Sequence, residues 1–171
     1  MFEKLKETHA LVWAVRNQLE TDGSHFKTPS QLRSLYHARG ELCEAFDLWM
    51  RETDPDEARN NERDDSFSDE CADALMMLMT ALGENQFSDL MYNDAIDLFN
   101  ERYYQHDIES DFNRAFENVG NAINILKSDQ HYTTVEMVVT DTIVLIAQTC
   151  PPSVDRVAFR LARIIAKNRV A

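Results

Sequence analysis

The stretch from Asp69 to Met79 reads DECADALMMLM, and the expected fold follows from it. It is apolar on nearly every side, which is typical of a helix buried at the centre of a helical protein. Glu70 and Asp73 stand three residues apart within it, so at about 100° per residue they project from one helix face, one turn apart. Because idle carboxylates are costly in such surroundings, this pair indicates a functional site.

A second acidic pair lies upstream in Gly40–Ala45, which reads GELCEA. Two successive helices joined by a short connection are expected to be antiparallel neighbours, so the two pairs can meet between them. Clustered carboxylates repel one another unless a hard cation such as Mg²⁺, which prefers carboxylate oxygens, is bound. One acidic pair is common on a solvated helix face. Two pairs in apolar runs predict a metal site formed by Glu41, Glu44, Glu70 and Asp73.

The rest of the chain predicts an all-α bundle of about six to seven helices around a central antiparallel hairpin that carries this site. Apolar residues recur at helical spacing, and no segment is convincing as a strand. Residues 54–65 are charged and poor in apolar side chains, so we expect an exposed loop there. Helices are expected at about residues 2–21, 28–53, 66–83, 88–105, 110–128, 133–149 and 152–170.

Local signals predict several helix ends. Thr28–Gln31 is typical of a capping box in which Thr28 is the N-cap. Ser66 or Ser68 is expected to cap the buried helix, and Gly83 to end it. In the helix at 88–105, the residues expected to face inward are Leu90, Ile96, Leu98 and Phe99.

Composition limits the class of protein. The 171 residues, 44% of them hydrophobic, suit one domain over residues 1–171, and four Gly and four Pro argue against a loop-rich β fold. The net charge of −13 makes binding to nucleic-acid backbones unfavourable. No apolar run is long enough to predict a membrane segment. The three cysteines lack metal-finger spacing, and a reducing cytoplasm is the expected location. Cys43 and Cys71 lie inside the acidic motifs, where we expect half-buried packing residues, with a redox role as the alternative.

Two pairs of segments suggest an internal repeat. Cys43–Leu48 aligns with Gly120–Ile125, and Asp73–Met76 aligns with Asp141–Val144. In the second copy the four acidic positions are occupied by Asn118, Asn121, Val138 and Asp141. A duplication whose second copy lost its metal explains this pattern, and so does a chance likeness of two amphipathic helix pairs.

The acidic motifs resemble those of a known superfamily. Glu-x-x-Glu, then 25 residues (45–69), then Glu-x-x-Asp, looks like the metal motif of the all-α nucleoside triphosphate pyrophosphatases, which include MazG-like enzymes and dimeric dUTPases and dCTPases. The resemblance covers about residues 30–83. It implies Mg²⁺-dependent cleavage of a triphosphate such as dUTP or dCTP into monophosphate and pyrophosphate. Mn²⁺ is a possible substitute, and the metal ligands would be Glu41, Glu44, Glu70 and Asp73.

Further residues are candidates for substrate binding. Trp13 and Asn17, with Gln18, can face the base, or they can be packing and surface positions. Arg156, Arg160, Arg163 and Lys167 form a basic stripe on the last helix. The stripe can bind phosphate oxygens, or it can be an exposed face that balances the acidic body.

Other functions remain open from the sequence. A ferritin-like di-iron protein would need Glu-x-x-His, which does not occur here. A non-catalytic acidic interaction module or nucleotide sensor is the alternative that the charge of −13 favours. The resemblance and the many apolar helices also predict a homo-oligomer, a dimer or a tetramer.

Overall fold

The computed structural model describes residues 1–22, 25–53, 65–100, 105–128 and 132–169. Within these ranges the chain forms seven α-helices and no strand, so the all-α prediction is confirmed. Of the expected loop at 54–65, all but Asp65 lies outside the described residues. The helices are α1 (Phe2–Thr21), α2 (Gln31–Thr53), α3 (Phe67–Leu82), α4 (Asp89–Asn100), α5 (Ile108–Lys127), α6 (Tyr132–Thr149) and α7 (Pro152–Arg169).

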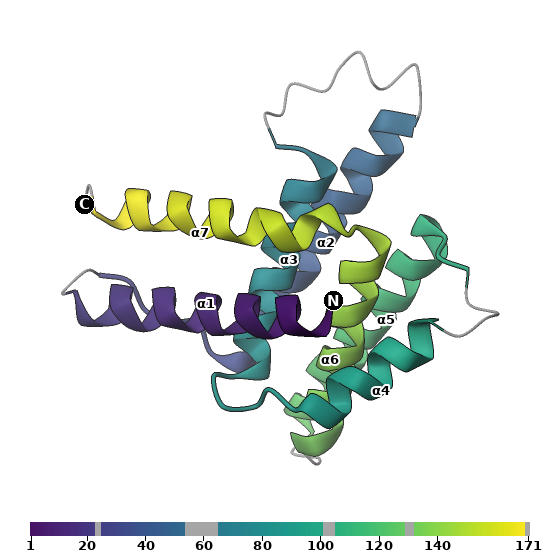
Figure 1. Cartoon of the computed structure of the whole chain (residues 1–171), viewed down its shortest axis with the longest axis horizontal. Helices are drawn as coiled ribbons and strands as arrows, with labels where there is room; N and C mark the ends of the chain where they lie inside the picture. Colours follow the sequence, from purple (N-terminus) through teal and green to yellow (C-terminus); the bar gives the residue numbers. More distant parts are fainter. Residues whose placement is uncertain (23–24, 54–64, 101–104, 129–131, 170–171) are drawn as a thin grey trace.

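Helix α3 lies at the centre of the bundle. It packs most extensively along α2, which precedes it in the chain, and it also contacts α1, α6 and α7. Helices α1 and α7 run side by side across it, and α4, α5 and α6 gather on one side of the molecule (Figure 1). Almost every side chain from Asp69 to Leu82 is buried, as the apolar composition of this stretch predicts.

The ends of α3 are fixed by its sequence. Ser66 is the N-cap: its Oγ accepts a hydrogen bond from the Asp69 N–H at 3.2 Å, and the Asp69 carboxylate accepts one from the Ser66 N–H at 3.0 Å. This reciprocal capping box satisfies two N–H groups that the helix itself cannot. At the other end Gly83 adopts φ of 93°, where a side chain would be strained. The capping box therefore fixes the first turn of α3, which carries Glu70.

The predicted cap of α2 is wrong. The helix begins at Gln31, and the Ser30 Oγ accepts the hydrogen bond from the Arg33 N–H at 3.3 Å. The Thr28 N–H instead binds the Glu20 carboxylate at 2.7 Å, so Thr28 belongs to the connection from α1.

The predicted inner face of α4 is partly wrong. Leu90 and Leu98 are 71% and 39% exposed, whereas Tyr92, Ala95 and Phe99 are buried. The buried residues follow the spacing of three and four that one helix stripe requires. Hydrophobicity alone pointed to the leucines, but the contact with α6 uses the adjacent stripe.

Helix packing is consistent with the internal repeat. Helices α2 and α3 pack together, and so do α5 and α6. Helix α4 follows α3 in the chain but packs on α6, while α7 follows α6 but packs on α3. Exchanging α2 with α5, α3 with α6 and α4 with α7 therefore reproduces these contacts, as expected for two related halves that exchange their third helices.

No single helix among those the structure describes is both long and apolar enough to cross a membrane. Only a bent pair, Val135–Thr149 with Pro152–Asn168, meets the requirement by length and composition, and it is bent by 105° at the break.

Replacing Leu75 with alanine tests whether α3 is the centre of the core. Leu75 is fully buried, so the cavity should lower the free energy of unfolding by about 2–5 kcal/mol, measured by urea denaturation. The matched control is Leu90→Ala on the exposed face of α4, which should change the free energy of unfolding by less than about 0.5 kcal/mol. Equal effects of the two substitutions would contradict the central placement of α3.

Candidate metal centre

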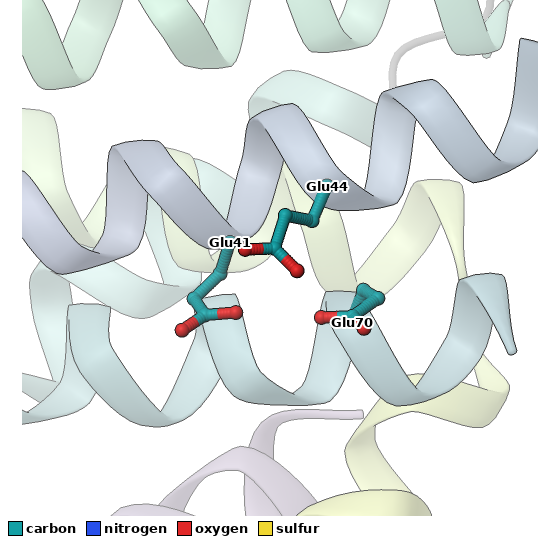
Figure 2. Close-up of side chains that lie close together, drawn as sticks. All are labelled: Glu41, Glu44 and Glu70. Carbon is teal, nitrogen blue, oxygen red and sulfur yellow. The ribbon is translucent and has the colours of Figure 1, made fainter. Parts of the chain in front are cut away.

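Three of the four predicted carboxylates meet between α2 and α3. Glu41 and Glu44 extend from α2 and Glu70 from α3, and their carboxylates lie in the space between the two helices (Figure 2). One oxygen from each residue lies within 4.8 Å of the others. Glu70 is buried, Glu41 is half-buried and Glu44 is exposed, so the cluster opens from the core toward solvent.

The backbone pattern explains why these acids converge. On α2 the neighbouring residues Leu42 and Ala45 are fully buried in the core. Burying that stripe turns Glu41 and Glu44 to the edge along which α3 runs. The capped first turn of α3 places Glu70 opposite them. The geometry that the two motifs predict is thus produced by ordinary helix packing.

Burial and repulsion perturb the ionisation of the cluster. Burial, then the charges of Asp73, Glu44 and Glu70, and a hydrogen bond with Glu70 raise the pKa of Glu41 to about 7. The pKa of Glu70 is raised by burial first and then by Glu44, Asp73 and Asp65, while Arg160 opposes the shift. Without a cation, a pKa of about 7 means that Glu41 is largely protonated below neutral pH. A set of oxygen donors that is short of positive charge suits a hard divalent cation such as Mg²⁺.

The fourth predicted ligand, Asp73, has a different partner. The Arg160 guanidinium donates to both of its carboxylate oxygens, with Nε 2.8 Å from Oδ1 and Nη2 bonded to Oδ2. Arg160 Nη1 also lies 2.7 Å from Oδ1 of Asp65, which Arg163 shares at 2.9 Å. Asp73 therefore stands outside the group of three, although its charge still acts on Glu41 and Glu70.

A cleft of about 270 Å³ adjoins the carboxylates. Helix α7 contributes cations to one wall, among them the predicted phosphate ligands Arg163 and Lys167, both exposed. The cleft therefore brings together anionic and cationic groups and a short apolar surface. Its lining residues are Glu41, Asp65, Asp73, Met76, Met77, Arg160, Arg163, Ile164 and Lys167.

The predicted base-binding residues lie elsewhere. The Trp13 indole N–H donates to the Met79 carbonyl oxygen at 3.2 Å, and the Asn17 amide donates to Glu84 at 2.8 Å. Trp13 lines a separate hollow of about 390 Å³ together with His9. In this structure both residues join α1 to the end of α3, as the packing alternative expects.

Asp65 is a residue of the site that no signal in the sequence identified. It ends a charged run that indicated only an exposed loop, yet its carboxylate binds Arg160 and Arg163 of α7. These arginines lie more than ninety positions further along the chain, and neither spacing nor composition pairs them with Asp65. The sequence showed the basic stripe but not which acid each arginine binds. Arg160 and Arg163 bind Asp65, whereas Arg156 binds Asp69 at 2.9 Å.

The cysteines near the motifs differ in burial. Cys71 is buried in α3, as expected for a packing residue, whereas Cys43 on α2 is exposed. The packing role predicted for Cys43 is therefore wrong, because it lies on the solvent side of the helix.

Comparison of the chain with models of known protein families, with curated proteins and with solved structures finds no match. What the site can do therefore rests on its own residues and their geometry.

The raised pKa of Glu41 predicts how stability depends on pH in the absence of metal. The folded protein keeps the Glu41 proton up to about pH 7, whereas the unfolded chain releases it near 4.5. Because the folded state binds more protons between these values, the free energy of unfolding falls as the pH rises through them. Glu41→Gln removes this loss, so in EDTA at pH 8 the variant should have a higher Tm than the wild type, and at pH 4 an equal one.

Glu52→Gln, at the exposed end of the same helix, is the matched control and should follow the wild type at both pH values. A lower Tm for Glu41→Gln in EDTA at pH 8 would show that Glu41 is not held among like charges.

Proposed function

We propose that the protein is an Mg²⁺-dependent nucleoside triphosphate pyrophosphohydrolase, like the all-α superfamily that its motifs resemble. The observation that supports this most directly is the meeting of Glu41, Glu44 and Glu70 between α2 and α3. Both acidic motifs contribute to that meeting. The substrate would be a (deoxy)nucleoside triphosphate such as dUTP or dCTP, cleaved between the α and β phosphates.

The carboxylates are suited to hold Mg²⁺, with Mn²⁺ as a substitute. All donors are oxygens, and the exposed side of the cluster at Glu44 leaves room for water and phosphate oxygens. Bound there, Mg²⁺ would neutralise phosphate charge and lower the pKa of a water. Raised carboxylate pKa values in the metal-free protein are the expected counterpart of a site that is completed by a cation.

The adjoining cleft supplies what a polyphosphate needs. Arg163 and Lys167 present exposed positive charges in the same cleft that Glu41 lines. Guanidinium and ammonium groups bind phosphate oxygens through charge-assisted hydrogen bonds. In the reaction, the oxygen of a water forms a bond to the α phosphorus and its proton passes to a carboxylate of the site. The bond from the α phosphorus to the bridging oxygen breaks, and pyrophosphate leaves with that oxygen.

A panel of triphosphates with pyrophosphate detection tests the proposal. In Mg²⁺ or Mn²⁺ at least one of them, dUTP and dCTP first, should yield monophosphate and pyrophosphate in equal amounts. Glu70→Gln should lower kcat/KM by at least about a hundredfold, because even residues that only support a metal ligand commonly contribute 10- to 100-fold.

Asp47→Asn is the matched control for this loss. Asp47 lies one turn beyond Glu44 on α2, where it pairs with Arg51 at 3.1 Å and takes no part in the cluster. Its replacement should leave turnover near the wild-type value. Pyrophosphate release from none of the triphosphates, in either metal, would refute the enzymatic proposal. Thermal stabilisation by nucleotides without turnover would then favour the nucleotide-sensing alternative.

A further inference from the structure

The ion pair between Arg160 and Asp73 is a prominent charge contact of the candidate site. Both side chains are largely buried, at 12% and 14% exposure, and the guanidinium binds both carboxylate oxygens. Such two-pronged pairing is strong and geometrically specific. It occupies the acid that the second motif offers one helical turn after Glu70.

This pair and a bound cation compete for the same carboxylate. Asp73 lies close enough to raise the pKa of both Glu41 and Glu70 by its charge, so it borders the cluster without joining it. While both of its oxygens accept hydrogen bonds from Arg160, about half of its lone-pair sites are occupied, and a metal ion bound at the others would lie close to the positive charge of the guanidinium. A cation at the glutamates would attract Asp73 and repel Arg160.

The cleft offers Arg160 a second place to bind. Arg160 lines it together with Arg163 and Lys167, where the proposed phosphate chain would lie. The fork that fits a carboxylate also fits two oxygens of a phosphate. Asp65 can hold the guanidinium near this position, because it accepts from Arg160 Nη1 at 2.7 Å and more weakly from Nη2 at 3.5 Å, whereas Nε donates to Asp73.

We propose that Arg160 exchanges partners during ligand binding: it releases Asp73 to the metal and binds a phosphate oxygen of the substrate instead. This inference rests on the proposed function and names a regulation of the same site. In the metal-free protein Arg160 supplies the positive charge that Asp73 lacks. In the loaded protein the cation supplies it, and the freed guanidinium faces the anionic ligand. Metal and phosphate therefore strengthen each other's binding, and the two effects are equal because binding coupling is reciprocal.

A double-mutant cycle on Mn²⁺ binding tests the first half of the exchange. Mn²⁺ affinity is measured by electron paramagnetic resonance, without nucleotide, for the wild type, Arg160→Gln, Asp73→Asn and the double variant. Arg160→Gln should tighten Mn²⁺ binding by about tenfold when Asp73 is present and by much less when it is absent. The same tightening in both backgrounds would reduce Arg160 to a distant charge and overturn the exchange. Weaker Mn²⁺ binding by Arg160→Gln would also overturn it.

Pyrophosphate binding tests the second half. With Mn²⁺ at saturation, isothermal titration of inorganic pyrophosphate should show about tenfold weaker binding to Arg160→Gln. Arg156→Gln is the matched control: Arg156 lies on the same helix and is also paired, to Asp69 at 2.9 Å, but it does not line the cleft. Unchanged pyrophosphate affinity in Arg160→Gln, or an equal loss in both variants, would overturn the inference.

Arg160→Lys is a second variant that keeps the exchange testable if Arg160→Gln does not fold. It keeps the charge but loses the two-pronged contact, so it should tighten Mn²⁺ binding less than Arg160→Gln and should weaken pyrophosphate binding. If Arg160→Gln does not fold, the same cycle with Arg160→Lys decides, and additive effects there overturn the exchange. A wild type that turns over nucleotides but shows an additive cycle refutes the exchange alone. A wild type that binds no Mn²⁺ refutes both proposals, and a coupled cycle without turnover refutes only the enzymatic one.

Discussion

The burial of Glu41 and Glu70 beside one another, and the repulsion of their carboxylates with that of Glu44, is the constraint on which the candidate site depends. Packing α2 along α3 buries an apolar stripe, and the same packing brings the three acids within 4.8 Å of one another. The cluster is partly buried beside the core, where charges are poorly solvated and like charges repel one another strongly. The fold thus concentrates negative charge at one place, and a proton or a cation must neutralise it.

The surrounding helices determine which of the carboxylates have a positively charged partner. Ser66 and Asp69 fix the first turn of α3, which holds Glu70 in place. Helix α7 crosses α3 and contributes Arg160, which compensates Asp73 and Asp65, so the remaining excess of negative charge falls on the glutamates. The acidic side of the cleft therefore comes from Glu41 of α2, Asp65 just before α3 and Asp73 within α3, and its basic side comes from α7. A chain of phosphates bound to a divalent cation has the matching arrangement of charge.

Much of the fold could be predicted because strong local signals agreed with the global packing. The apolar run at Asp69–Met79 indicated a buried helix, and the paired acids on two successive helices indicated where they would meet; the structure bears out the meeting for Glu41, Glu44 and Glu70. The buried face of α4 was mispredicted because its leucines are more hydrophobic than the stripe that contains Tyr92, which is the stripe that is buried. In a short helix, a rotation by one residue position changes which side faces the core.

The rest of the site could not be predicted because it depends on contacts between distant segments. The residues around Asp73 in the sequence do not predict its pairing with Arg160. Those around Trp13 do not predict that its indole N–H donates to the Met79 carbonyl oxygen. Such partners are set by how α1 and α7 cross α3. The most direct measurement of the central claim is the anomalous scattering of a crystal grown with Mn²⁺. We expect one strong peak between α2 and α3, about 2 Å from oxygens of Glu41, Glu44 and Glu70. Ordered glutamates without a peak between them would contradict it.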